Sequence, residues 1–255
     1  MESLKRYLYN HKFLLVAHRG SSGTAPENTL AAYSRALSLN VPGIEIDIHQ
    51  TKDFEIVAFH DDALGRTAEG NKKIEETTLE DLRKLDVGSW FGDEFNSEKI
   101  PTLEEILELV GNKAFLIIEL KPNNKDPEAF VQNLIRKISK NHSVNKVILV
   151  SFDYALLKMA KNINEFFLTA AIKIPGQNIL PSSIIENSSA DAVICSVDEL
   201  NDTFVGNAKD NSIGLAVYDV DNEEQLKKAL KYQVRGIGTN YPETIIELLR
   251  KFEIL

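Results

Sequence analysis

The sequence contains a single cysteine, Cys195, so one chain cannot form an internal disulfide and no oxidising compartment is required. Its setting, DAVICSV, is typical of a buried strand, and we expect an unreactive thiol there. Long hydrophobic runs are also lacking, since none approaches the roughly 20 residues of a membrane span. The N-terminus has neither the apolar core nor the small-residue cleavage site of a signal peptide. We therefore expect a cytoplasmic protein without stable membrane insertion.

Positive charge is in short supply. The 29 lysines and arginines are outnumbered by 38 aspartates and glutamates, which gives a formal net charge of −9. Because nucleic-acid-binding surfaces are usually basic, we expect no nucleic-acid partner. A few local cations would still suffice for a small phosphorylated ligand. The oligomeric state stays open between a monomer and a small homo-oligomer.

Short apolar runs alternate with amphipathic helical patterns along the 255 residues. Such βα alternation implies parallel strands with right-handed crossovers. Eight principal strands are expected, in FLLVA, GIEIDI, AFLIIELK, VILVSF, FFLTAAI, DAVICSV, IGLAVY and VRGIGT. Eight units favour a closed (β/α)8 TIM barrel, and the lack of a GxGxxG turn after the first strand disfavours a dinucleotide-binding open sheet. We expect residues 1–255 to form one domain.

Residues 53–101 interrupt this alternation between the second and third expected barrel strands. The segment is too long for an ordinary βα loop, and it contains a short strand pattern and the helix-like TLEDLRKL. We expect a small inserted lobe over one barrel mouth. Trp90, Phe91 and Phe95 are expected to form the core of this lobe; the alternative is that they line a greasy mouth.

Charged side chains gather where the first expected strands end, which is where TIM barrels place their active sites. Glu45 and Asp47 share one face of their strand, as do Glu119 and Lys121, because alternate residues of a strand point the same way. The candidate set in chain order is His18, Arg19, Glu45, Asp47, His60, Glu119 and Lys121. The other three histidines are assigned structural roles, and His49 is expected to point away from the face of Glu45 and Asp47.

The candidate set makes chemical sense as a unit. Three carboxylates around one point repel each other, and a hard divalent cation, Ca²⁺ or Mg²⁺, relieves that repulsion. The metal candidates are therefore Glu45, Asp47 and Glu119. Arg19 and Lys121 supply positive charge for an anionic substrate group.

His18 and His60 are suited to general acid/base work near neutral pH. Together with acidic metal ligands and fixed cations, they suggest metal-assisted phosphoryl transfer. Each residue alone has a structural explanation, such as a hydrogen-bonded core histidine or a surface ion pair. Their joint placement at successive strand ends favours a functional site.

The blocks AHRG, APENTLAAY, GIEIDIHQTKD, VAFHDDALGRT, IPTLEEIL and IELK together resemble the glycerophosphodiester phosphodiesterases, in that family's order and spacing. The resemblance runs from about residue 14 to the end and is densest up to Lys121. It implies a TIM barrel with an inserted lobe and metal-dependent hydrolysis of glycerophosphodiesters to sn-glycerol 3-phosphate and an alcohol. By position it implies that His18 and His60 are the acid/base pair.

The resemblance leaves the chemical details open. We assign His18 as the base and His60 as the acid, although the reverse order is an alternative. The attacking group is either the glycerol 2-hydroxyl or water. Two other functions remain as alternatives: a lysophospholipase D-like enzyme for longer-chain substrates, and a phosphodiester-binding barrel without catalysis. The pair of proton-transfer groups argues against the last.

Three positions call for separate expectations. Tyr218 stands where the family often has tryptophan, so we expect an aromatic wall for the substrate with a changed pocket shape. Asn240 stands where an acidic residue is common, and we expect it to alter only the electrostatics of the rim. In APENTL, Asn28 is expected to cap the first barrel helix, while Glu27 lies near the site without a catalytic role.

Overall fold

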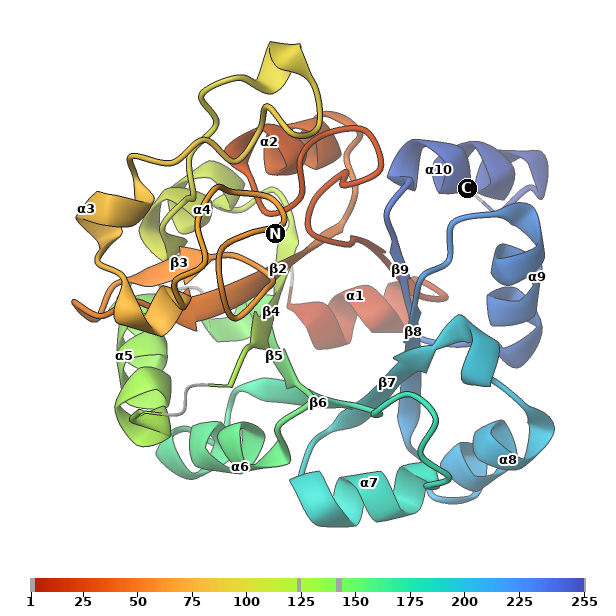
Figure 1. Cartoon of the computed structure of the whole chain (residues 1–255). Coiled ribbons are helices and arrows are strands. Elements are labelled where there is room, and N and C mark those ends of the chain that lie inside the picture. Colours follow the sequence, from red (N-terminus) through yellow and green to blue (C-terminus); the bar gives the residue numbers. More distant parts are fainter. Residues whose placement is uncertain (1–2, 123–124, 141–143, 255) are drawn as a thin grey trace.

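The computed structural model describes residues 3–122, 125–140 and 144–254. Within these ranges, eight parallel strands close into a barrel, because β1 pairs with both β2 and β9 (Figure 1). The barrel strands are β1 (Leu14–Ala17), β2 (Gly43–Gln50), β4 (Phe115–Leu120), β5 (Val147–Ser151), β6 (Leu168–Ile172), β7 (Ala192–Ser196), β8 (Gly214–Tyr218) and β9 (Gly236–Thr239). The predicted TIM barrel is confirmed.

Helices surround the barrel and connect successive strands (Figure 1). They are α2 (Leu30–Ser38), α4 (Leu103–Val110), α5 (Pro127–Lys140), α6 (Tyr154–Ile163), α7 (Pro181–Ser188), α8 (Asp202–Asp210), α9 (Glu223–Tyr232) and α10 (Pro242–Lys251). Short 3₁₀ turns, η3 (Val144–Lys146) and η4 (Val197–Glu199), precede β5 and follow β7. In the described part of the chain, no helix is both long enough and apolar enough to cross a membrane.

A helix that the sequence reading did not anticipate, α1 (Leu4–Asn10), covers the amino-terminal end of the barrel. Leu4 packs into the cluster of inward-facing side chains, and the ring of Tyr7 meets that of Phe115 edge-on at 5.3 Å. Arg235, just before β9, donates to the Lys12 carbonyl at 2.8 Å. Figure 1 looks down the barrel onto α1 at its far end.

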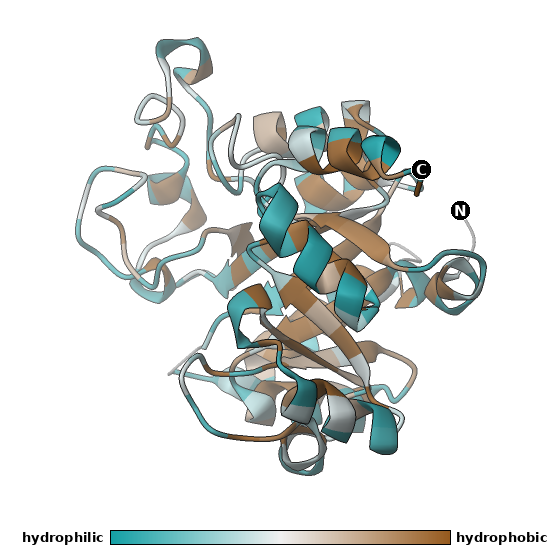
Figure 2. Ribbon diagram, turned by 90° about the vertical axis from the view of Figure 1, so that its right-hand side faces the viewer, coloured by the Kyte–Doolittle hydropathy of each residue, from teal (hydrophilic) through white to brown (hydrophobic). Residues whose placement is uncertain are grey.

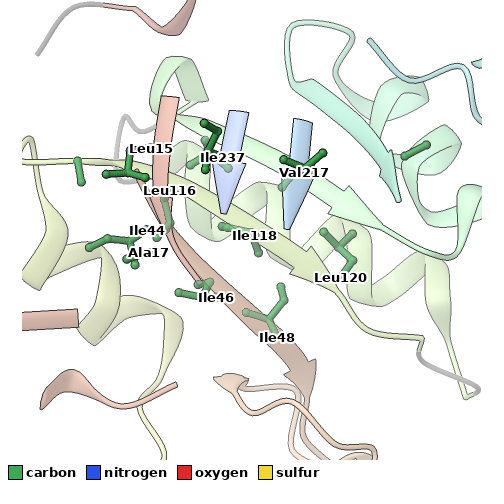
Figure 3. Close-up of a cluster of buried hydrophobic side chains, with 14 of the residues drawn as sticks. Leu15, Ala17, Ile44, Ile46, Ile48, Leu116, Ile118, Leu120, Val217 and Ile237 are labelled. Carbon is green, nitrogen blue, oxygen red and sulfur yellow. The ribbon is translucent and has the colours of Figure 1, made fainter. Parts of the chain in front are cut away.

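Side-chain alternation divides the core into two layers. Outward-facing residues of the strands pack against the helices in one large cluster (Figure 3). In β2 these are Ile44, Ile46 and Ile48, all fully buried, and each is worth about 1.5–3 kcal/mol of hydrophobic stabilisation. The residues between them, Glu45 and Asp47, therefore face the inside of the barrel. Alternation in a single strand thus places the acidic residues in the interior.

The inserted segment, residues 53–101, begins with β3 (Ile56–Ala58), which pairs antiparallel with β2. It continues through η1 (Ile74–Glu76), α3 (Leu79–Leu82) and η2 (Asp93–Phe95). Its small core contains Val57, Phe59, Ala68, Ile74, Leu82, Val87 and Ile100. Figure 2 shows the long loops at the opposite end of the molecule from the N-terminus.

The expectation that Trp90, Phe91 and Phe95 form this core is wrong. Trp90 is 46% exposed, and its Nε1 donates to the Val87 carbonyl at 2.8 Å, which fixes the indole at the surface. Phe91 meets both of the other rings edge-on, at 5.5 and 5.6 Å. The three rings therefore form a partly exposed row beside the aliphatic core.

Candidate active site

The turn after β1 sets His18 and Arg19 at the carboxyl end of the barrel. Arg19 and Gly20 both have left-handed backbones, with φ of 57° and 81°. A Cβ on Gly20 would lie 2.6 Å from the backbone of Ala32 in α2, so only glycine fits. The Arg19 amide then donates to Glu45 Oε2 at 2.8 Å. An unusual backbone conformation is thus held in place by helix packing and by a site carboxylate.

The predicted capping role of Asn28 is wrong. Thr29 caps α2 instead, since its hydroxyl accepts from the Ala32 amide at 3.2 Å. Asn28 has φ of 57°, which turns its side chain towards β2. There its Nδ2 donates to Asp47 Oδ2 at 2.7 Å, and its Oδ1 accepts from the Asp47 amide at 3.1 Å. Asn28 therefore orients one of the metal candidates.

Glu45, Asp47 and Glu119 come together as predicted. Each offers a carboxylate oxygen, and these oxygens lie within 4.8 Å of one another. Burial and the charge of Asp47 raise the pKa of both Glu45 and Glu119. Burial also acts to raise the pKa of Asp47, but Lys121 and Arg19 outweigh it and hold that pKa well below its usual range. Lys121 Nζ lies 2.8 Å from Asp47 and 2.6 Å from Glu119.

The acidic cluster has the donors that a hard divalent cation requires. Among the described residues, Glu45 Oε1 is buried and has no hydrogen-bond partner. Asp47 Oδ1 makes no hydrogen bond of normal geometry either, although Lys121 is an ion-pair partner. Buried carboxylate oxygens without such bonds are costly, and Ca²⁺ or Mg²⁺ prefers oxygen ligands of this kind. The cluster could therefore hold one such ion.

His18 is held by a residue that was expected to affect only the rim. Asn240 Oδ1 lies 2.9 Å from His18 Nδ1, and Asn240 Nδ2 donates to Asp221 Oδ2 at 2.7 Å. The Ser22 hydroxyl lies 2.9 Å from the same Asn240 oxygen. The expectation for Asn240 is therefore wrong, because barrel closure brings the loop after β9 directly against the loop after β1. His18 Nε2 faces the site, 3.9 Å from Glu45.

His60 is held differently, by a carboxylate from the adjacent residue. Its Nδ1 lies 2.7 Å from Asp61 Oδ1. Arg66 donates to Asp61 at 2.8 Å and also to both carboxylate oxygens of Glu27, which in turn accepts from Arg19 at 2.9 Å. Burial lowers the pKa of His60, an effect that nearby acidic groups oppose. Neither Asp61 nor Arg66 is among the site residues predicted from the sequence, although the acid next to His60 in FHDD is a usable signal.

Most of the predicted site residues share one cavity of about 520 Å³. Those that line it are His18, Arg19, Glu45, His60, Glu119 and Tyr218. Phe152 and Asp219, which the sequence reading did not single out, line the same cavity. The lining from the described residues does not include Trp90, Phe91 or Phe95, so these rings do not form a greasy mouth.

His49 lies on the same side of β2 as Glu45 and Asp47, so the expectation that it points away is wrong. Residues 45, 47 and 49 are separated by two positions each, and the strand continues to Gln50. His49 is 5% exposed, and its Nε2 lies 3.4 Å from the carbonyl oxygen of His60. Burial lowers its pKa to about 4. It is a neutral buried support for the segment that carries His60.

The fold and site define the class: a TIM-barrel enzyme whose polar site, with three carboxylates, two cations and two histidines, lies at the carboxyl ends of its strands. Residues 18–244 match the model of the glycerophosphoryl diester phosphodiesterase family. The chain therefore belongs to this family and is a phosphodiesterase.

Individual relatives cover nearly the whole chain. A glycerophosphodiester phosphodiesterase of Caldanaerobacter subterraneus subsp. tengcongensis is 35% identical over 94% of this chain and 99% of its own. A glycerophosphodiester phosphodiesterase of Bacillus subtilis is 31% identical over 91% of this chain and 85% of its own. Among solved structures, an Oleispira antarctica phosphodiesterase in complex with the product sn-glycerol-3-phosphate is 28% identical, with a TM-score of 0.87 over 95% of this chain and 99% of its own.

Proposed function

We propose that this enzyme hydrolyses glycerophosphodiesters to sn-glycerol 3-phosphate and an alcohol, with the help of one divalent cation, Ca²⁺ or Mg²⁺. The observation that carries the proposal is the convergence of His18, His60, Glu45 and Glu119 on one cavity, with Asp47 completing the acidic cluster beside it. The relative that was solved with sn-glycerol-3-phosphate supports the identity of the product. Small phosphodiesters are thus the proposed substrates.

The partners of the two histidines support a division of roles. Asn240 presents an oxygen to His18 Nδ1, so neutral His18 carries its proton there and keeps Nε2 free as a base. Asp61 presents a carboxylate to His60 Nδ1, which stabilises the imidazolium form. We therefore assign proton removal from the attacking hydroxyl to His18. His60 donates a proton to the oxygen of the leaving alcohol.

The remaining residues bind and orient the substrate. Arg19 lines the cavity and offers its guanidinium to the phosphate, while Lys121 reduces the negative charge of the acidic cluster and adds a second cation. Tyr218 provides an aromatic wall for the glycerol. Glu45, Asp47 and Glu119 would hold the cation, which supplies charge stabilisation to the phosphoryl oxygens.

We also propose that the barrel and the inserted segment act as one domain. Arg66 of the inserted segment donates to Glu27, in the loop after β1, at 2.9 and 2.7 Å. β3 extends the barrel sheet through β2. The inserted segment therefore carries His60 on a support that is continuous with the barrel.

The test uses protein stripped with a chelator and then reloaded with Mg²⁺ or Ca²⁺. We expect release of glycerol 3-phosphate from glycerophosphoethanolamine only in the reloaded sample, and calorimetry should show binding of one ion. A double variant, His18→Ala with His60→Ala, should be inactive, whereas His11→Ala at an exposed histidine should match the wild type. Turnover by the double variant would refute the acid/base assignment, and undiminished turnover in chelator would refute the need for a cation.

A further inference from the structure

His60 follows the last strand residue of the inserted segment, beyond the sheet itself. β3 ends at Ala58, and His49 of β2 supports the backbone carbonyl of His60 at 3.4 Å. Among the described residues, the hydrogen-bond partner of the His60 ring is Asp61, through Nδ1 and Oδ1 at 2.7 Å. Because Asp61 is the next residue in the chain, this contact orients the imidazole within its own segment. A further link is needed to place the ring relative to the barrel.

Arg66 supplies that link, because its guanidinium spans two carboxylates. Nε donates to Asp61 Oδ2 at 2.8 Å, and Nη2 donates to Asp61 Oδ1 at 3.1 Å. On the other side, Nη1 and Nη2 donate to the two oxygens of Glu27 at 2.9 and 2.7 Å. All the nitrogens of the side chain are therefore used, two for each carboxylate. A planar fork of this kind fixes the orientation of both partners as well as their separation.

Glu27 continues the link to the barrel. Its Oε1 also accepts from Arg19 Nη1 at 2.9 Å, so one oxygen is shared by two guanidinium groups. Burial acts to raise the pKa of Glu27, but Arg66 and Arg19 outweigh it and hold that pKa below its usual range. The ionised side chain of Glu27 thus connects the inserted segment to Arg19, the residue that offers its guanidinium to the phosphate.

The backbone is defined at both ends of this connection. In the inserted segment, the loop around Arg66 is closed by a hydrogen bond from the Gly65 amide to the Ala68 carbonyl at 2.9 Å. In the loop after β1, the Asn28 amide donates to the Arg19 carbonyl at 3.1 Å. The ion pairs therefore join two loops that other hydrogen bonds already shape, and they set how these loops lie relative to each other.

Charges alternate in sign along the connection. From the barrel outwards, the order is Arg19, Glu27, Arg66, Asp61 and protonated His60. Arg66 therefore stands between two carboxylates that repel each other without it. If Arg66 lost its charge, Asp61 would turn away from Glu27 and carry the imidazole of His60 with it.

We propose that Arg66 is a positioning residue for the general acid: together with Glu27, it holds the imidazole of His60 in a set place relative to the bound phosphate. Neither Arg66 nor Glu27 touches the reacting atoms, and both act through the side chains that they hold. This inference rests on the proposed function of the same site. It adds to that function two residues that the proposed proton transfers do not use.

A misplaced acid affects different alcohols unequally. In the proposed step, a P–O bond forms to the attacking oxygen, whose proton passes to His18. The P–O bond to the head group breaks, and His60 gives its proton to the released oxygen. Ethanolamine is a poor leaving group that needs this proton, whereas p-nitrophenolate leaves as a stable anion without it. Two esters therefore separate a fault in the position of His60 from general damage to the site.

The first experiment measures kcat of the metal-loaded enzyme on glycerophosphoethanolamine and on the p-nitrophenyl ester of glycerol 3-phosphate. Arg66→Gln should lower kcat on the first substrate by about 10- to 100-fold and on the second by less than about threefold. Retained activity on the second also shows that the variant is folded. An equal loss on both would overturn the inference. A wild type that hydrolyses neither would refute the proposed function and this inference with it.

The matched control is Arg83→Gln, because Arg83 also ties the inserted segment to the barrel, through partners other than Asp61 and Glu27. It pairs with Glu105 of α4 and donates to the Ile100 carbonyl at 3.0 Å. The control should lower the thermal unfolding midpoint and leave the ratio of the two rates unchanged. A fall in that ratio as large as the one in Arg66→Gln would show that any loosening of the segment has this effect, and would overturn the specific role of Arg66.

The conservative variant tests the geometry of the fork. Arg66→Lys keeps the positive charge, but an ammonium group cannot pair with both carboxylates in the same arrangement. It should therefore recover little of the activity on glycerophosphoethanolamine that Arg66→Gln loses. Full recovery would show that charge alone is sufficient and would contradict a positioning role.

A double-mutant cycle tests whether Glu27 and Arg66 form one link. Glu27→Gln should lower the ratio of the two rates and also raise KM, because Arg19 loses a partner. Combined with Arg66→Gln, it should lower the ratio no further than Arg66→Gln does alone, since both changes break the same connection. Effects on the ratio that multiply would mean that the two residues act independently, and would refute the link.

Discussion

Asn240 and His18 lie 222 positions apart in the chain, yet Asn240 Oδ1 is 2.9 Å from His18 Nδ1. The orientation of the amide is fixed, because its Nδ2 donates to Asp221 and its oxygen must then face His18. An amide oxygen cannot donate, so the proton of the hydrogen bond belongs to His18 Nδ1. The free lone pair of neutral His18 therefore lies on Nε2, the atom that faces the site.

This contact predicts that Asn240→Leu lowers kcat while KM changes little. The imidazole loses the partner that fixes its ring and tautomer, and general acid/base catalysis is worth about 10²–10⁴-fold. We expect a loss of about tenfold or more. The measurement is steady-state kinetics on glycerophosphoethanolamine, with Asn96→Leu at an exposed loop position as control. A kcat equal to that of the wild type would show that the hydrogen bond does not organise His18.

The contrast between this contact and the rest of the site shows what a sequence can and cannot predict. Alternation in β2 placed Glu45 and Asp47 on one face, and parallel strands bring Glu119 beside them. Those inferences need only local periodicity and the barrel topology. The contact to Asn240 depends on the closure of β9 against β1 and on side-chain directions in two loops, which no local pattern specifies.

The amount of space inside the barrel could not be predicted from the sequence pattern either. The strands were recognised as apolar runs, but an apolar run does not show how much space its inward-facing residues leave. The small residues at 214, 216, 236 and 238 line one shared cavity only because β8 and β9 are neighbouring strands. Likewise, APENTL predicts a helix cap at Asn28, because the left-handed backbone that redirects this side chain cannot be seen in the sequence.

A second prediction concerns Asp61, the carboxylate partner of His60. Asp61→Asn removes the charge that stabilises protonated His60, so the variant should lose at least about tenfold in kcat. The imidazolium would also give up its proton more easily, so the alkaline limb of the kcat profile should move to lower pH. The exposed neighbour provides the control, Asp62→Asn. An alkaline limb that stays in place would count against His60 as the general acid.

A third prediction uses the repulsion within the acidic cluster. Burial and the charge of Asp47 raise the pKa of Glu45, so ionised Glu45 destabilises the metal-free fold. Glu45→Gln should therefore raise the thermal unfolding midpoint in chelator at pH 8, by about 2–4 °C for each kcal/mol relieved. Saturating Mg²⁺ or Ca²⁺ should stabilise the variant less than the wild type, because one ligand has lost its charge.

The control for this comparison is Glu80→Gln on α3, where the side chain is 85% exposed. It should leave both the midpoint in chelator and the gain on adding the cation close to those of the wild type. If Glu45→Gln instead lowered the midpoint in chelator while gaining as much from the cation as the wild type does, Glu45 would not belong to a metal site.

The last prediction concerns stability in acid. Burial lowers the pKa of His49 to about 4, from an ordinary value of 6.5. Between these values the unfolded chain binds more protons than the folded one, so the free energy of unfolding falls as the pH drops from about 6.5 towards 4. One pKa unit corresponds to about 1.4 kcal/mol, so His49 should account for a loss of up to a few kcal/mol.

His49→Gln tests this assignment because it keeps a donor for the carbonyl of His60 and removes the titration. Urea unfolding in chelator should give a shallower loss of stability between pH 6.5 and 4.5 for the variant than for the wild type. His11→Gln, at an exposed histidine, should follow the wild-type curve. Parallel curves for His49→Gln and the wild type would mean that His49 takes up its proton equally in the folded and unfolded protein, and that burial does not keep it neutral.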